Sequence, residues 1–415
     1  MADIPKIRFK GFTEPWEQRK LGDIYGSIGN AFVGTATPYY AEHGHFYLES
    51  NNVKDGQINH NAEIFINDEF YEKQKDKWLH TGDMVMVQSG HVGHAAVIPE
   101  ELDNTAAHAL IMFRNPKEEI EPYFLNYEYQ TDKAKKQIEN ITTGNTIKHI
   151  LASDMQEFVV DIPKYEEQKA IAGYFCKLDH LITLHQRKCD DTKKLKKYML
   201  QKMFPKNGEK FPEIRFKGFT EAWEQRKLSD VTESIKNGYT YRADGSRDHR
   251  YKITRIESIS SGVINTEKLG SSDEVNENYR LVDGDILFSH INSLPYIANT
   301  ALYTADLGEI YHGMNLLNIR SRHEEIDSHF LLHLLKKEST RDWFRIIAKP
   351  AVNQASISTT EVGSFKFLIP GMEEQKKISS SLDNLDHLIT LHQRKCDTLK
   401  ELKKYMLQNM FPKKG

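Results

Sequence analysis

The stretch IRFKGFTEPWEQRKL occupies residues 7–21, and IRFKGFTEAWEQRKL occupies residues 214–228. The two copies lie 207 residues apart and differ only where Pro15 is replaced by Ala222. A repeat at a fixed spacing within a chain of 415 residues indicates that a whole structural unit is duplicated. The first half of the chain can therefore be compared with the second, position by position.

Further identical strips keep the same spacing. The longest, DHLITLHQRKCD, begins at Asp179 and again at Asp386, and KKYMLQ follows in both copies. The other strips are EEQK at 166–169 and 373–376, and MFPK at 203–206 and 410–413. The repeat therefore extends through the whole chain.

Between these strips the halves diverge but keep a common outline. TGDMVMVQSGH (81–91) resembles DGDILFSHIN (283–292), with β-branched and aromatic runs bounded by Gly and Asp, as in strands. The chain thus has the order A–B–C–A′–B′–C′, in which A is a short leading segment, B an α/β domain and C a long helix. The expected bounds are 1–161 for the first A and B, 162–206 for the first spacer helix, 207–368 for the second A and B, and 369–415 for the second spacer helix.

The C segments carry the clearest helix signal. From Glu166 to Phe204 there is no proline and only one glycine, and Pro205 marks the end. A narrow apolar stripe with charged flanks runs along each segment; it would fit a core helix, but two near-identical copies favour pairing with each other. The expected fold class is α/β (α+β): two tandem α/β domains separated by two long helices that form an antiparallel coiled coil, with pseudo-two-fold symmetry.

Composition excludes several classes of protein. No apolar run approaches 18 residues, which excludes a membrane span, and the N-terminus lacks the apolar core of a signal peptide. Cys176, Cys189 and Cys396 have no CxxC spacing, and we expect them to pack as small hydrophobic groups in a cytoplasmic protein. The net charge is −3, yet 163–210 carries +6 and 370–415 carries +3, so the remainder carries −12. Any anion-binding surface is therefore local.

Catalytic motifs are missing from the sequence. The only Asn-Pro pair lies in NPKE at 115–118, which lacks the second proline and the aromatic residue of an adenine methyltransferase motif. There is no GxGxxG, no GxxxxGK[ST] and no HExxH. His180 and His185 are five residues apart, not four, so they do not predict a zinc pair. We expect a chain with no catalytic residues and no metal of its own.

The pattern of sameness and divergence predicts two kinds of contact. Identical A and C strips can meet the same partner twice, whereas divergent B domains on one scaffold should meet two different targets. The IP…EEQK junctions (162–169 and 369–376) and the helix end KKLKKYMLQKMFP add to these strips. With all of them present, the chain resembles the specificity (S) subunit of type I restriction-modification systems over essentially its whole length. Each strip alone is weak, but the combination, present twice at one spacing, is specific.

The resemblance implies a function. Each B segment would be a target recognition domain that reads one half of a bipartite, asymmetric site in double-stranded DNA. The C helices would set the gap and dock two methyltransferase (M) subunits, and restriction (R) subunits would complete an ATP-dependent nuclease. S-adenosylmethionine, ATP and Mg²⁺ would belong to those partners, so the chain itself would bind no cofactor and no membrane. The alternatives are a non-catalytic assembly scaffold with duplicated ligand-binding domains, and the recognition partner of a combined type II-like enzyme.

Base readout requires short polar or bidentate side chains on loops that can reach a groove, and phosphates attract Lys and Arg. The halves offer such loops in matching places, although each loop could equally be an ordinary solvent-exposed turn. In the first domain the candidates are Gln88, Ser89, His91, His94, Thr143, Asn145, Thr146 and Lys148. In the second they are Tyr239, Tyr241, Arg242, Ser289, His290, Asn292, Lys349, Asn353, Gln354 and Ser356.

Contacts with partner subunits are expected on the repeated strips. WEQRKL should begin a helix that packs each domain onto its spacer, anchored by Phe12, Trp16 and Leu21 and their counterparts. The candidate partner-binding residues are Trp16, Leu178, Leu181, Trp223, Leu385 and Leu388.

Overall fold

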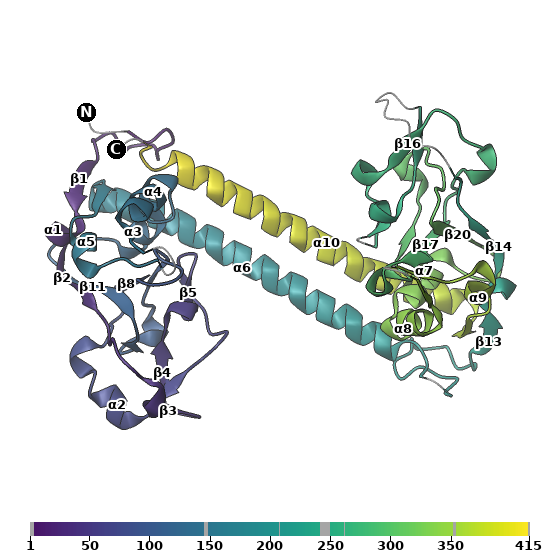
Figure 1. The fold of residues 1–415 in the computed structure, drawn as a ribbon, viewed down its shortest axis with the longest axis horizontal. Coiled ribbons are helices and arrows are strands. Elements are labelled where there is room, and N and C mark those ends of the chain that lie inside the picture. The colour runs from purple at the N-terminus through teal and green to yellow at the C-terminus, as the bar shows by residue number, and fades with distance from the viewer. Residues whose placement is uncertain are drawn as a thin grey trace. The chain divides into compact units, whose positions relative to one another are not determined.

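The computed structural model describes residues 4–144, 148–206, 208–240, 250–260, 262–351 and 354–413 (Figure 1). It consists of two compact units. The first unit holds Met1–Gln186 and Arg394–Gly415, and the second holds Arg187–Gln393. Each unit therefore combines one α/β domain with parts of both long helices.

The first unit is built on a four-stranded antiparallel sheet in the order β2-β11-β8-β9. The strands are β2 (Tyr25–Asn30), β11 (Leu110–Pro116), β8 (Met84–Val87) and β9 (Ala95–Val97). Side chains alternate across it: Met84 and Met86 enter the larger hydrophobic core, whereas Val85 and Val87 enter a second core on the other face. Both faces are buried, which is why MVMV reads as a continuous apolar run.

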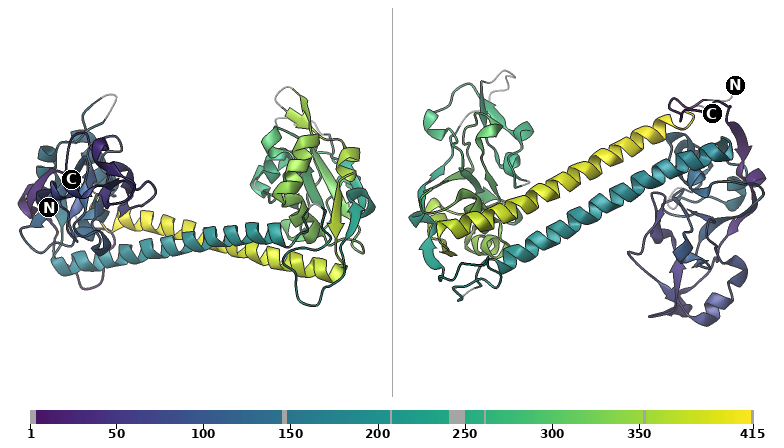
Figure 2. Two further views of the ribbon diagram at one scale, coloured as in Figure 1. Left: turned by 90° about the horizontal axis from the view of Figure 1, so that it is seen from below. Right: turned by 180° about the vertical axis from the view of Figure 1, so that it is seen from behind.

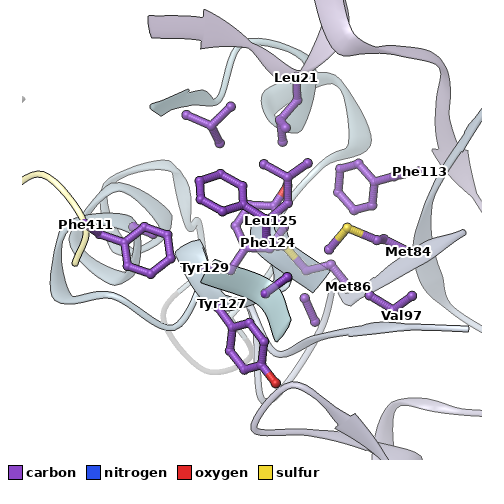
Figure 3. Close-up of a cluster of buried hydrophobic side chains, with 14 of the residues drawn as sticks. Leu21, Met84, Met86, Val97, Phe113, Phe124, Leu125, Tyr127, Tyr129 and Phe411 are labelled. Atoms are coloured by element: carbon purple, nitrogen blue, oxygen red, sulfur yellow. The ribbon is translucent and has the colours of Figure 1, made fainter. Parts of the chain in front are cut away.

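Shorter elements complete this unit. Four short strands form a second sheet in the order β10-β4-β7-β3, and β5 pairs with β6. Their bounds are β3 Tyr40–Ala41, β4 His45–Leu48, β5 Val53–Lys54, β6 Gln57–Ile58, β7 Phe65–Ile66 and β10 Ala106–Ala107. The helices are α1 Leu21–Ile24, α2 Asp68–Glu72, α3 Pro122–Glu128, α4 Asp132–Ile141 and α5 Ala152–Gln156. Figure 3 shows the larger core, where aromatic rings of α3 pack among residues of β8 and β11.

The second unit repeats this plan with a sheet in the order β14-β20-β17-β19. These strands are β14 (Thr232–Asn237), β20 (Leu316–Ser321), β17 (Ile286–Ser289) and β19 (Thr300–Leu302). The remaining strands are β15 Tyr251–Ile253, β16 Gly270–Ser272, β18 Ile291–Asn292, β21 Lys349–Ala351 and β22 Gln354–Ser356, and the helices are α7 Ser328–Lys336, α8 Glu338–Ile347 and α9 Thr359–Gly363. The prediction of two tandem α/β domains is confirmed.

The repeated WEQRKL strip forms a strand, so the prediction of a helix there is wrong. β1 (Glu17–Lys20) pairs with β12 (Val159–Ile162), and β13 (Glu224–Lys227) pairs with β23 (Lys366–Ile369), both antiparallel. Glu, Gln, Arg and Lys favour helices in isolation, but a neighbouring β-branched strand that needs a partner outweighs this preference. The strip therefore connects the start of each domain to its end.

The two long helices are confirmed as α6 (Tyr165–Lys202) and α10 (Met372–Asn409). In the first unit Lys403 on α10 bonds Asp179 on α6 at 2.7 Å, and the Cys396 thiol lies 3.6 Å from Oε1 of Gln186. Rising numbers on one helix meet falling numbers on the other, so the helices pair antiparallel within this unit (Figure 2).

The second unit repeats this pairing with the helices exchanged. Lys196 bonds Asp386 at 2.5 Å, and the Cys189 thiol lies 3.6 Å from Oε1 of Gln393. Both cysteines are buried between the helices, as expected of small hydrophobic groups. In the part of the chain that the structure describes, no helix is long and apolar enough to cross a membrane.

The MFPK strips complete the domain cores. Phe411, which follows α10, packs edge-on against Trp16 of the first unit with ring centroids 5.9 Å apart. Phe204, which follows α6, packs edge-on against Trp223 of the second unit, also at 5.9 Å. The predicted anchoring of each domain by its tryptophan is therefore confirmed, with the end of a spacer helix as the contact.

The EEQK strips explain the repeated arginine. Arg8 makes a bidentate ion pair with Glu167, with both contacts at 2.6 Å, and Arg215 makes the same pair with Glu374 at 2.7 and 2.8 Å. Both glutamates are almost completely buried. The following residue, Gln168, donates to the carbonyl of Pro163 and accepts from the backbone N–H of Glu121. The identical strips are thus the residues that join each leading segment to its domain and its helix.

Candidate nucleic-acid interface

The two candidate loops of the first unit lie side by side. The backbone N–H of Ile150 donates to the carbonyl of Gln88 at 2.9 Å, and that of Gly90 donates to the carbonyl of Lys148 at 3.1 Å. Ser89 also pairs with His149 in an isolated β-bridge. The end of β8 and the turn after α4 therefore form one polar surface from segments some 60 residues apart.

That turn is a small hairpin. Thr143 and His149 exchange two backbone hydrogen bonds, at 2.9 and 2.8 Å, and so close it. Thr143 and Lys148 are exposed on it. Two other candidates, Asn145 and Thr146, lie outside the described residues. The paired residues hold Thr143 and Lys148 at the surface.

The side chains of QSGHVGH differ in exposure. His91 is exposed, and His94 is half-buried, with its Nδ1 accepting from the backbone N–H of Asp55 at 3.2 Å. Burial lowers the pKa of His94, so this imidazole is neutral at physiological pH. Gln88 is 5% exposed and cannot present its amide to a base, so its assignment is corrected to a residue that supports the loop from inside.

The second unit brings its candidate loops together by the same pairing, with longer strands. β18 pairs with β22, which pairs with β21, in a three-stranded sheet. The backbone N–H of Ile357 also donates to the carbonyl of His290 at 2.9 Å. SHINS and the hairpin of β21 and β22 therefore share one surface, and Asn353, in that hairpin, lies outside the described residues.

Two candidates of SHINS are interior groups. Ser289 is completely buried, and its hydroxyl accepts from the Asn292 amide at 3.1 Å. His290 is 7% exposed, and burial lowers its pKa to about 4, so it is neutral and cannot attract phosphate by charge. Both are corrected from contact residues to supporting residues.

The groups that remain accessible in the second unit lie on the hairpin and at Asn292. Lys349 and Gln354 are exposed, and Asn292 and Ser356 are partly exposed. Lys349 bonds Glu361 at 2.9 Å, which offsets its charge. Tyr239 lies apart from this hairpin: its backbone N–H donates to the carbonyl of His312, and its ring lies 5.4 Å from that of Tyr279. Tyr241 and Arg242 lie outside the described residues.

A lysine-lined hollow beside the first loop was missed by the sequence analysis. A cavity of about 520 Å³ is bordered by His94 and Gly93 of the loop. Four lysines line it from α4 and α10: Lys135, Lys400, Lys403 and Lys404. Asp55, Asp132 and Glu139 also line it and Lys403 is paired with Asp179, so only part of this positive charge is available to an anion such as phosphate. The lysine run of the C segment was visible in the sequence, but its proximity to the loop depends on the antiparallel helix pairing.

The candidate partner-binding residues separate into two groups. Trp16, Trp223 and Leu178 are at most 6% exposed within their own unit, so a direct contact with another subunit is corrected to a role in the core. Leu385 is partly buried against the same core, whereas Leu181 and Leu388 are 40% and 41% exposed.

Those two exposed leucines belong to a repeated apolar stripe. The further members are Leu184, Leu195 and Tyr198 on α6 and, 207 residues later, Leu391, Leu402 and Tyr405 on α10; all are at least 37% exposed. The sequence contained this row of apolar residues, but it could not show which apolar positions face the neighbouring helix and which face outward.

Comparison with known proteins places this geometry in context. The profile of the type I restriction modification DNA specificity domain matches residues 13–193 and again 220–401. The putative type I restriction enzyme MjaX specificity subunit of Methanocaldococcus jannaschii is 39% identical over 209 residues, 49% of each chain. This match therefore spans about half the length of that relative. The MjaVIII specificity subunit of the same organism is 23% identical over 408 residues, covering 95% of this chain and 91% of the relative.

Solved structures share the fold. The S subunit of a type I restriction-modification system from M. genitalium matches with a TM-score of 0.68 and 15% identity, over 99% of this chain and 100% of that one. A chain from a structural study of type I R-M complex assembly matches with a TM-score of 0.50 and 17% identity, over 96% and 98%. Two similar domains and long helices are therefore common to these chains.

Proposed function

The chain belongs to the type I restriction-modification DNA specificity family, and we propose that it selects the DNA sequence for such a complex, each unit reading one half of a bipartite, asymmetric site. It supplies no catalytic group. Methylation and cleavage belong to M and R subunits, which bring S-adenosylmethionine, ATP and Mg²⁺. An assembly scaffold with duplicated ligand-binding domains is the less favoured alternative.

One observation carries the proposal. Each unit joins the end of a central strand, β8 or β17, to a polar hairpin that follows two helices, and the two units use different side chains there. A shared support with different polar groups is what two readers of different half-sites need.

The docking of M subunits is assigned to the exposed apolar stripe. Its residues recur at a spacing of 207 on both helices, so the same surface is offered twice. Large apolar side chains that are exposed in the isolated chain and arranged in a row favour a protein partner. One M subunit would bind the stripe residues of each unit.

Methylome mapping tests the DNA assignment. The chain is co-expressed with an M subunit of the same system, and methyladenine is mapped across the host genome. We expect one gapped motif with two different halves. Exchange of residues 230–367 for the corresponding domain of another specificity subunit should change one half only, and lengthening α6 and α10 should change only the gap. If no bipartite motif appears, the scaffold alternative is supported instead.

A matched pair of substitutions tests the docking surface. Leu184→Asp and Leu391→Asp occupy the same position in the two copies of the stripe. Each should remove one M subunit from the complex, and the double variant should remove both, as measured by the mass of the purified assembly. Lys194→Ala, an 80% exposed side chain on α6, is the control and should keep both M subunits. Retention of two M subunits by the double variant would assign docking elsewhere.

A further inference from the structure

Four nitrogen- and oxygen-bearing side chains meet between α7 and α10 in the second unit. Nδ1 of His329 and Nε2 of His333 each lie 2.8 Å from a different oxygen of Asp383. Asp386 lies one turn further along α10, and His333, Asp383 and Asp386 each offer a ligand atom within 4.8 Å of those of the other two. The ligand atoms of His333, Asp383 and Asp386 therefore share one small volume, and His329 adjoins them through the other oxygen of Asp383.

Helical spacing explains the convergence. His329 and His333 are four residues apart on α7, so both imidazoles project from the same face. Asp383 and Asp386 are three residues apart on α10 and likewise share a face. A pair of histidines at this spacing is a recurrent zinc-binding arrangement. The donors come from two rigid helices, not from a loop.

We propose that these four residues form a binding site for a divalent transition-metal ion, with Zn²⁺ the best match. Imidazole nitrogen and carboxylate oxygen are ligands that zinc accepts, at about 2.0–2.2 Å in a tetrahedral arrangement. Such bonds place neighbouring ligand atoms about 3.3 Å apart, so each 2.8 Å contact needs to open by only about half an ångström. The ion takes the place of the two N–H protons that now bridge the imidazoles to Asp383, and each histidine binds through a bare nitrogen.

The fourth ligand position lies near two lysines, Lys196 and Lys336, whose charges act on the carboxylates of Asp383 and Asp386. Lys196 bonds Oδ2 of Asp386 at 2.5 Å, which leaves Oδ1 of the same carboxylate for the metal. The side chains of His329 and Asp383 are 45% and 38% exposed, so an ion can enter from solvent. His333 is fully buried and its Nε2 faces the site, while its Nδ1 bonds no group in the described part of the chain.

The first unit has no histidine at the matching positions. The helix stretch PYFLNY aligns with SHFLLH, so Tyr123 and Tyr127 stand where His329 and His333 stand. On α6, Cys176 and Asp179 stand where Asp383 and Asp386 stand. The hydroxyl of Tyr127 donates to Asp179 at 2.8 Å, which closes that junction with a hydrogen bond. The metal site is therefore specific to the second recognition domain.

Zinc would fasten the second recognition domain to its spacer helix. α7 belongs to the α/β domain, whereas Asp383 and Asp386 belong to α10. Because the ion binds the folded arrangement and not separated helices, it should raise the unfolding temperature of the second unit with the logarithm of its free concentration above the dissociation constant. This site is independent of the DNA-reading loops and of the docking stripe.

Zinc titration of the full chain tests the proposal. Chelator-treated protein is titrated with ZnCl₂ by calorimetry, and Co²⁺ is used in parallel because its visible absorption reports tetrahedral nitrogen and oxygen ligands. We expect one ion per chain. His329→Ala and Asp383→Asn should each weaken zinc binding by more than about tenfold. Loss of a group that only supports a metal ligand already weakens binding by about tenfold or more, and loss of a ligand itself should cost at least as much. Since His329 is half exposed, this variant should still fold, which circular dichroism checks.

The control is His387→Ala, which removes an exposed histidine from the same helix. It should bind zinc as the unchanged chain does, and so should Tyr123→Ala at the corresponding position of the first unit. Absence of a stoichiometric ion, or binding that survives both His329→Ala and Asp383→Asn, would overturn the proposal.

Discussion

The two units of this chain are most alike where they contact their own spacer helices. The Arg8–Glu167 and Arg215–Glu374 pairs have nearly the same lengths, and Trp16 and Trp223 meet a phenylalanine at the same 5.9 Å. These contacts involve the residues that are identical in sequence. Identity between the halves is therefore explained by internal assembly as well as by shared partners.

Away from these strips, the units fill equivalent positions with different chemistry. Tyr127 hydrogen-bonds a spacer helix where His333 faces a cluster of carboxylates, and Glu128 is buried where Leu334 packs in the core. The recognition loops keep the same pairing, Ile150 to Gln88 and Ile357 to His290, but carry different side chains on it. The identical contacts between each domain and its spacer helices form a fixed frame. This frame permits such divergence, since each domain keeps these contacts while its interior and its loops change.

The largest effect should come from the buried ion pairs. Arg8→Met and Arg215→Met each leave an almost fully buried glutamate without its cation, which should cost about 3–5 kcal/mol of unfolding free energy. The effects should be equal, and each should be confined to one unit. Urea unfolding with hydrogen exchange resolved along the chain measures both.

Lys10→Met and Lys217→Met, on exposed lysines of the same strips, are the controls and should change stability by less than about 0.5 kcal/mol. A difference of more than about 1 kcal/mol between the two arginine variants would contradict the equivalence of the frames.

The ion pairs between the helices should reveal a difference between the units. Asp179 is 15% exposed, so Lys403→Met leaves a poorly hydrated carboxylate and should cost about 2 kcal/mol. Asp386 is 42% exposed and can regain water, so Lys196→Met should cost less than about 1 kcal/mol. The same unfolding measurement applies, and the reverse order of the two costs would show that burial does not control these pairs.

Much of this frame could be predicted from sequence because repeats and periodicity are local signals. The 207-residue spacing gave two domains, and a proline-free run with an apolar stripe gave α6 and α10. The strip Glu17–Lys20 was predicted as a helix because its residues favour helices, but its strand pairing with Val159–Ile162 depends on residues about 140 positions away. Pairing of this kind has no local signature.

The candidate site could be predicted only at the level of loops. Both loops, QSGHVGH and SHINS, lie at the expected surfaces, but burial of Gln88, Ser289 and His290 could not be read from polarity alone. Polar residues at a strand end can point inward when a neighbouring segment covers them. The lysines of the hollow were missed because they are far from the first domain in sequence, and α10 reaches the first unit only in the folded chain.

The buried carboxyl of Glu128 should make the first unit sensitive to pH. Burial raises the pKa of Glu128 well above its ordinary value, so the folded state binds a proton that the unfolded state releases. Its contribution to stability is complete below about pH 4, the pKa of an unfolded glutamate, and is lost as the pH rises through the folded pKa. Glu128→Gln keeps an acceptor for the backbone N–H of Asp161 and removes the charge.

We expect Glu128→Gln to stabilise the first unit by about 1 kcal/mol near neutral pH and to have little effect near pH 4. Unfolding followed across this pH range by hydrogen exchange in the first unit provides the measurement. The second unit, with Leu334 at this position, is the internal control and should be unaffected. Destabilisation at neutral pH would mean that the Glu128 charge is compensated within the fold.

The smallest expected effects concern the recognition hairpins and depend on the proposed function. Lys148 and Lys349 are exposed lysines on corresponding hairpins, but only Lys349 bonds a carboxylate, Glu361, at 2.9 Å. Hydrogen bonds from Ser358, together with Lys349, lower the pKa of Glu361 to about 2, so this carboxylate stays charged at any physiological pH. The positive charge of Lys349 is therefore partly offset before DNA arrives, whereas that of Lys148 should act on a phosphate at full strength.

In the complex with M subunits, Lys148→Ala should weaken DNA binding by about 1 kcal/mol and reduce the slope of log K against log salt concentration by about 1. Lys349→Ala should reduce both by less than half as much. Binding to the cognate site is measured at several salt concentrations, with Lys10→Ala as the control. Equal losses would show that Glu361 releases Lys349 when DNA binds, and the second hairpin would then be a surface that rearranges on binding while the first is already formed.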